Sequence, residues 1–135
     1  MTEDPRPSFP PLFSGLAVSG QIDPFEKASA EATRGCDAGL VVYNLGANTL
    51  EAAIVFAPDV TLEKAMAVLP LCGIGFQNAL GALAPPEVAV HLEWAGGLRI
   101  NGARCGASAL RWWAGIVAGA VRAFWRYTLC RRQYR

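Results

Sequence analysis

The sequence lacks the residues that most metal centres and nucleophilic active sites need. His91 is its only histidine, and its four cysteines, at positions 36, 72, 105 and 130, include no CxxC pair. We therefore expect no zinc site. We expect the cysteines to be reduced thiols in a cytoplasmic protein, with two or three of them packing as small apolar side chains. No serine or cysteine forms a recognisable catalytic pattern with His91, so covalent catalysis is not indicated.

Acidic residues are missing from the last third of the chain. All eleven lie at or before Glu93, whereas eight arginines and no acid follow from Arg99 onward. The formal net charge of +1 therefore divides into −5 for residues 1–110 and +6 for residues 111–135. Such an asymmetry can mark a tail that binds nucleic acid or a membrane surface, or a segment of different origin. The first thirteen residues have no basic or long apolar region, which excludes a signal peptide there.

Length and composition predict one folded domain. A chain of 135 residues is long enough to bury roughly two-thirds of its surface without a metal or disulfide. Apolar residues make up 53% and charged residues 17%, which is not the composition of a disordered protein.

Capping residues and apolar runs predict a short helix followed by two strands. Asp23 is suited to cap a helix over residues 24–34, and Gly35 is suited to end it. The apolar runs 40–43 and 52–56 predict adjacent, antiparallel strands.

A longer helix and a second group of strands are predicted after these. Thr61 can cap a helix whose apolar stripe reaches Leu83, and Pro70 must kink or divide that helix. Asn101-Gly102 is a favoured hairpin turn. The apolar segments around it predict three strands, over residues 88–92, 98–100 and 103–107. The order of elements predicts an α+β fold with a mixed or antiparallel sheet and its helices packed on one face.

The segment LEWAGGLRINGARCGA, residues 92–107, resembles the central hairpin of the biotin/lipoate A/B protein ligase family. That hairpin has the form K-W-P-N-D-hydrophobic-x-hydrophobic-x-G-x-K-hydrophobic-A-G. The matching residues are Trp94, the hydrophobic pair Leu98 and Ile100, and the hairpin glycine Gly102. Arg104 stands where the family has its catalytic lysine. Residues 48–80 are also similar to the strand and helix that precede this hairpin.

The resemblance implies a function and a set of site residues. Family members activate biotin or lipoate with ATP, and a lysine of an acceptor domain then attacks the acyl-adenylate. It therefore implies a catalytic role for Arg104, ligand binding by Trp94, Asn48, Gly102 and Arg104, and ATP with Mg²⁺ beside biotin or lipoate. The implied partners are a small carboxylic acid, a nucleotide and a biotinyl or lipoyl acceptor domain, with no nucleic acid.

Several departures from the family pattern favour an alternative. The family's basic G-R-G-R-x-G loop is replaced by CDAGLVVYNLGAN, residues 36–48, which contains no arginine. Glu93 replaces the lysine before the tryptophan, and residues 95–97 lack the aspartate that could organise Mg²⁺. The alternative is a non-catalytic domain of the same fold that binds a ligand or a partner.

We divide the chain into an extended arm, a ligase-like domain and a basic tail. The arm covers residues 1–12, the incomplete domain 13–107 with a short edge strand within 13–20, and the tail 108–135. Three interpretations of the tail stay open: a membrane span, an amphipathic helix at a membrane surface, and a frame-shifted or truncated end outside the family pattern. Ten residues between Arg111 and Arg122 are too few to cross a bilayer, which counts against the first. We favour the third, because the tail is rich in Arg, Ala, Gly, Trp and Cys, contains no acid and breaks abruptly with the family pattern.

Overall fold

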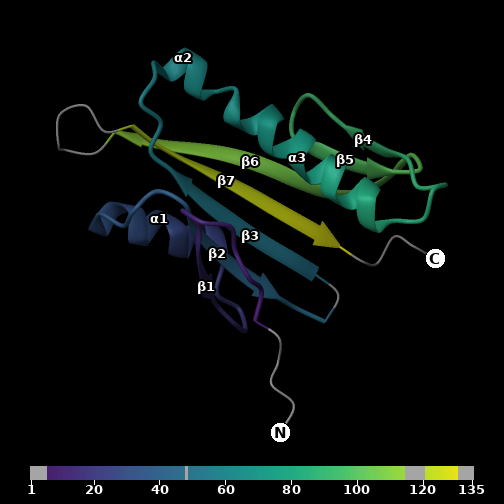
Figure 1. Ribbon diagram of the computed structural model, residues 1–135, viewed down its shortest axis with the longest axis horizontal. Helices are drawn as coiled ribbons and strands as arrows, with labels where there is room; N and C mark the ends of the chain where they lie inside the picture. The colour runs from purple at the N-terminus through teal and green to yellow at the C-terminus, as the bar shows by residue number, and fades with distance from the viewer. Residues whose placement is uncertain (1–5, 48, 115–120, 131–135) are drawn as a thin grey trace, which may run out of the picture.

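The computed structural model describes residues 6–47, 49–114 and 121–130, and its strands form one mixed sheet (Figure 1). Across the sheet the strands follow the order β1-β2-β3-β7-β6-β5-β4. Edge strand β1 runs parallel to β2, and every other neighbouring pair is antiparallel. The elements are β1 (Ser14–Ala17), α1 (Pro24–Arg34), β2 (Leu40–Leu45), β3 (Thr49–Phe56), α2 (Leu62–Ala65), α3 (Val68–Leu83), β4 (Val90–Leu92), β5 (Gly97–Ile100), β6 (Ala103–Ala114) and β7 (Val121–Cys130). The α+β class and the antiparallel pairing of β2 with β3 are confirmed.

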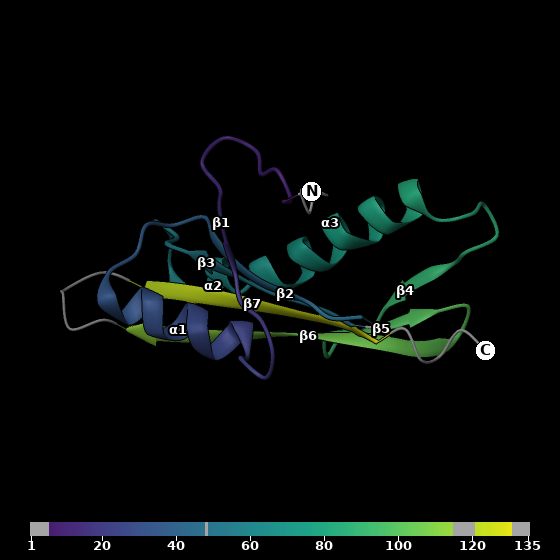
Figure 2. The ribbon, with the colours of Figure 1, turned by 90° about the horizontal axis from the view of Figure 1, so that it is seen from below.

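Helices α1 and α3 cover opposite faces of the sheet, whereas the sequence predicted both on one face (Figure 2). The reason is the alternation of side chains along β3. Ala53 and Val55 belong to the core beneath α1, while Ile54 and Phe56 pack in the core beneath α3. One strand therefore supplies both cores, a pattern that a continuous apolar run does not reveal.

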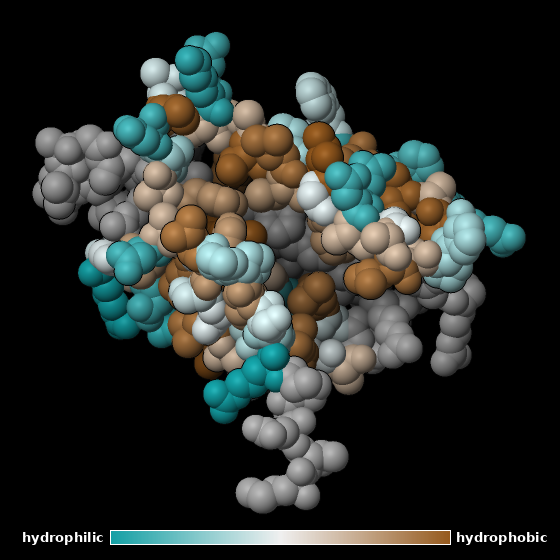
Figure 3. Space-filling view, in the orientation of Figure 1, coloured by the Kyte–Doolittle hydropathy of each residue, from teal (hydrophilic) through white to brown (hydrophobic). Residues whose placement is uncertain are grey.

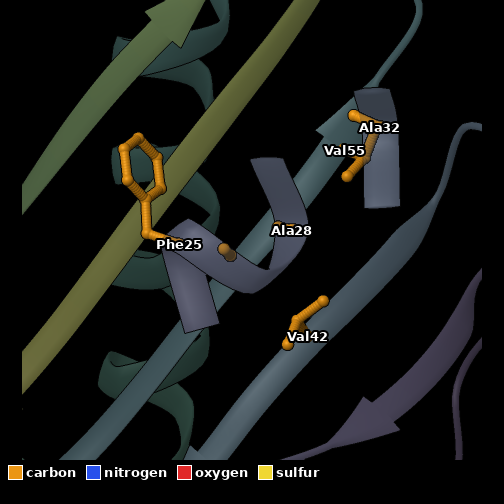
Figure 4. Close-up of a cluster of buried hydrophobic side chains, with 6 residues drawn as sticks. Phe25, Ala28, Ala32, Val42 and Val55 are labelled. Atoms are coloured by element: carbon orange, nitrogen blue, oxygen red, sulfur yellow. The ribbon is translucent and has the colours of Figure 1, made fainter. Parts of the chain in front are cut away.

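The core beneath α1 is made of small and branched side chains (Figure 4). Ala28 and Ala32 of α1 lie over Val42 of β2 and Val55 of β3, and the ring of Phe25 extends over β7. The helix has the predicted limits, because the Asp23 carboxylate accepts a hydrogen bond from the Phe25 amide at 2.8 Å. At its other end Gly35 adopts a left-handed φ of 95°.

The second helical segment is divided, as the proline predicted, into α2 and α3. The division falls at residues 66–67, just before Pro70, which has no amide hydrogen for the helical ladder. By length and composition alone, Leu62–Leu83 is apolar enough to cross a membrane. Its side chains also pack on the sheet, through Leu69, Cys72, Phe76 and Leu80. Burial in this core raises the pKa of the Cys72 thiol to about 11.

The described part of the basic tail lies inside the sheet, which differs from the expected boundary at residue 107. Strand β6 continues to Ala114, and β7 (Val121–Cys130) pairs with both β3 and β6. Arg111 also contacts α1, since its guanidinium lies 2.9 Å from the Glu26 carboxylate and 4.6 Å from the centre of the Phe25 ring. A helix at a membrane surface is therefore wrong for residues 121–130.

We predict that Leu98→Ala lowers the free energy of unfolding by about 2–5 kcal/mol, because it leaves a cavity in the core beneath α3. Leu98 is 1% exposed. The matched control is Leu71→Ala on α3, where the leucine is 62% exposed and the expected change is within about 0.5 kcal/mol. Chemical denaturation measures both. Equal effects of the two substitutions would contradict this assignment of the core.

Candidate functional site

A cavity of about 380 Å³ lies between α3 and the turn that joins β4 to β5. It lies on the α3 face, next to the core that contains Leu98. Its lining is mostly apolar and consists of Leu69, Pro70, Gly73, Ile74, Leu92, Glu93, Trp94, Gly96, Gly97 and Ser108. The structure thus places a cavity between the resembled hairpin and the long helix.

Trp94 stands at the rim of this cavity with 96% of its surface exposed. The turn that carries it is fixed by its backbone, because the Gly96 amide donates to the Glu93 carbonyl at 2.9 Å. Gly96 has a φ of 93°, and the Ser108 amide donates to its carbonyl at 2.7 Å. A side chain at Gly96 would meet the Ser108 backbone. The turn therefore presents the indole to solvent from a well-fixed backbone.

Arg104 does not line the cavity, because it pairs with Arg99, which alternates with Leu98 and Ile100 and so lies on the other face of the sheet. Leu98 pairs with Gly106 and Arg99 pairs with Arg104, so Cys105 is an extra residue on β6. Cys105 packs with Leu98 beneath α3. Arg104 and its partner Arg99 therefore lie on the face that carries α1. The structure separates Trp94 from Arg104, which the sequence had assigned to one site.

Close to Arg104, Glu93, which replaces the lysine of the family motif, forms an ion pair with Arg99. The Arg99 side chain donates from Nε to Glu93 Oε1 and from a terminal nitrogen to the Gly102 carbonyl at 2.9 Å. The hydrogen bond from Arg99 is the main cause that lowers the pKa of Glu93, and the charges of Arg99 and Arg104 lower that pKa further. Sequence reasoning missed Arg99. The sequence could have indicated it, because a tight turn between residues 92 and 98 places Arg99 opposite His91 and therefore close to Glu93.

The remaining expected site residues have other positions. Gly102 is at the tip of the β5–β6 hairpin with a φ of 83°, where the Asn101-Gly102 turn requires a left-handed backbone. Asn48 lies outside the described residues. The ligand-binding roles assigned to these residues stay predictions.

The described residues do not fit a magnesium-dependent nucleotide site. They contain no group of three or more His, Cys, Asp or Glu side chains that could hold a metal ion. Residues 36–47, where the resemblance places the family's basic loop, carry no lysine or arginine to face phosphate groups. Among the described residues, the arrangement offers the exposed guanidinium of Arg104, without an ion-pair partner, on the α1 face and an apolar cavity on the α3 face.

Comparisons with known proteins identify the relatives of this chain. The model of the biotin/lipoate A/B protein ligase family matches residues 9–120. A similar solved structure is the crystal structure of a biotin protein ligase-like protein of unknown function from Silicibacter sp. TM1040. It is 54% identical, with a TM-score of 0.84 over 91% of this chain. This chain covers 54% of that protein, about half its length. No curated protein matches.

The extent of the family match corrects the interpretation of the tail. The match continues to residue 120, so the expectation that the family pattern ends at residue 107 is wrong for residues 108–120. Residues 108–114 belong to strand β6, which pairs with β7 along this stretch.

We predict that Arg99→Gln raises the pKa of Glu93 towards its ordinary value, because the hydrogen bond to the carboxylate loses its charge. Glu31 is the internal control, since its pKa is lowered mainly by a hydrogen bond from Lys27. A carboxylate with a lowered pKa stabilises the fold above its unfolded pKa, and that contribution is lost as the pH falls through the folded value. Carboxyl ¹³C NMR titration measures both residues. An unchanged Glu93 midpoint in the variant would contradict the role of Arg99.

Proposed function

The chain belongs to the biotin/lipoate A/B protein ligase family, and we propose that it binds a small carboxylic acid of the biotin or lipoate class. The proposed site is the face of the sheet that carries α1. Arg104 would contact the carboxylate of the ligand, at the position where the family has its lysine.

The observation that carries this proposal is the environment of Arg104. It is exposed, and no hydrogen bond or ion pair joins it to another described side chain. The neighbouring charges of Glu93 and Arg99 compensate one another through their ion pair. A guanidinium binds a carboxylate through two parallel hydrogen bonds, so Arg104 has the geometry and the charge for this ligand.

The surface next to Arg104 leaves room for a ligand. Ala107 and Ala109 follow on the same face of β6, are exposed, and have side chains of one carbon. Arg111 lies further along β6 on the same face as Arg104. Its guanidinium is 2.9 Å from the carboxylate of Glu26 on α1. The ligand would thus lie between a fixed arginine at α1 and a free arginine at the hairpin.

We place the ligase reaction second. Membership of the family favours ATP-dependent adenylation followed by transfer to a lysine of a biotinyl or lipoyl acceptor domain. Against it stands the lack of basic residues over positions 36–47 and of a described metal-binding group. Binding without adenylation needs neither feature.

We predict that saturating biotin or lipoate raises the melting temperature by roughly 5–10 °C, because a ligand at about 100 times its Kd adds about 2.7 kcal/mol. Arg104→Gln should weaken binding about 10- to 100-fold, the effect of losing a charge-assisted hydrogen bond. Arg104→Lys should retain part of the affinity through its charge. The control is Arg34→Gln, since Arg34 lies on α1 in an exposed pair with Glu31.

Three outcomes of calorimetry and of an assay for pyrophosphate release separate the alternatives. Ligand binding without pyrophosphate release supports the binding domain. Release of pyrophosphate that needs biotin or lipoate would establish the ligase reaction in its place. No binding of either acid, or equal binding by Arg104→Gln, would contradict the proposed site.

A further inference from the structure

We propose that the cavity between α3 and the β4–β5 turn is a second binding site, for a small uncharged apolar molecule that Trp94 covers. The site lies on the face of the sheet opposite Arg104, so this inference does not rest on the proposed function. It concerns a cavity whose walls come from α3, β4, the turn and β6.

The size and chemistry of the cavity suit a small apolar ligand. Its volume of about 380 Å³ falls at the lower end of the range of about 300–1,000 Å³ that is usual for ligand pockets. Leu69 and Ile74 project into its lining from α3, and Leu92 does so from β4. Burial of apolar surface against such walls is the main source of affinity for a ligand of this kind.

Two residues without large side chains on α3 create the hollow. Gly73 is buried, and a Cβ atom there would lie 3.3 Å from Cδ1 of Leu92, so a larger residue would press on that wall. Pro70 lines the cavity one turn earlier. The cavity is thus a feature of the α3 sequence and the β4 strand together.

The polar groups of the cavity are already engaged, which selects an uncharged ligand. Glu93 contributes to the lining, but its carboxylate is paired with Arg99 on the α1 face. The Ser108 hydroxyl donates to the Gly96 carbonyl at 3.1 Å. No lysine or arginine lines the cavity. An anion in the cavity would therefore find no cation in the lining to pair with, and burying an unpaired charge is costly.

The exposure of the surrounding side chains indicates that the cavity is incomplete when empty. Trp94 is 96% exposed and Ile74 is 48% exposed. Hydrophobic side chains also gather over α3 in the space-filling view (Figure 3). An indole is a large apolar surface with a flat face for stacking on a ring. A ligand in the cavity would cover that face and the inner side of Ile74.

Binding of indole, followed by ¹H–¹⁵N NMR, tests this site. We expect a saturable titration with shifts at the Trp94 indole and at residues 69–74 and 92–97. Trp94→Ala and Ile74→Gln should each weaken binding at least about fivefold, since each removes apolar contact. Both side chains are too exposed to be needed for folding. The control is Ile22→Gln, because Ile22 is 52% exposed and does not line the cavity.

The charge preference is tested in the Arg104→Gln background, so that the proposed carboxylate site does not contribute. There indole should bind as in the unmodified protein, and indole-3-acetate at least about fivefold more weakly. Equal affinity for the two would contradict the exclusion of anions.

Other results would overturn the inference itself. These are shifts confined to other residues, or equal indole binding by Trp94→Ala and Ile74→Gln and the Ile22→Gln control. A dimer in sedimentation that Ile74→Gln dissociates would assign this surface to a second copy of the chain instead.

Discussion

The fold depends on the strand β3, which supplies side chains to both hydrophobic cores. Ala53 and Val55 face α1, and Ile54 and Phe56 face α3, so neither helix has a complete core without this strand. Successive side chains of a strand point to opposite faces of the sheet, so a strand covered on both faces must contribute to two cores. It also gives the two faces of the sheet separate chemistry, because each helix covers only part of its face. The charged groups and the apolar cavity are consequences of what each helix leaves open.

The extra residue at Cys105 decides which charges share a face. Arg104 and Arg111 are seven positions apart, so in a regular strand their side chains would point in opposite directions. The register of the β5–β6 pairing shifts by one residue between Leu98 and Arg99 of β5. This shift reverses the facing of the later residues of β6, so both arginines lie on the α1 face. It also buries the Cys105 thiol, where desolvation raises its pKa. A single inserted residue therefore places Arg104 of the hairpin on the same face as Arg111, which contacts α1.

Local signals in the sequence predicted the helices, the hairpin and the antiparallel strands, because caps, turns and alternation act over a few residues. The sequence could not assign faces. Trp94 and Arg104 were given one site because they belong to one motif, yet the turn directs Trp94 to the cavity and the pairing with Arg99 directs Arg104 away from it. Nor could it place residues 108–114 and 121–130, whose basic, tryptophan-rich composition hides their pairing in the middle of the sheet.

The charges on the α1 face favour a carboxylate over a nucleotide. Glu93, Arg99 and Arg104 together carry +1. A lysine at position 93, as in the family pattern, would raise that sum by two and would leave no partner for Arg99. A triphosphate carries several negative charges and needs several cations or a metal ion to offset them, whereas a single carboxylate is matched by one guanidinium. The substitution at position 93 and the missing basic loop change the face in the same direction. Both lower the positive charge relative to the family pattern, and both leave Arg104, the proposed carboxylate contact, in place.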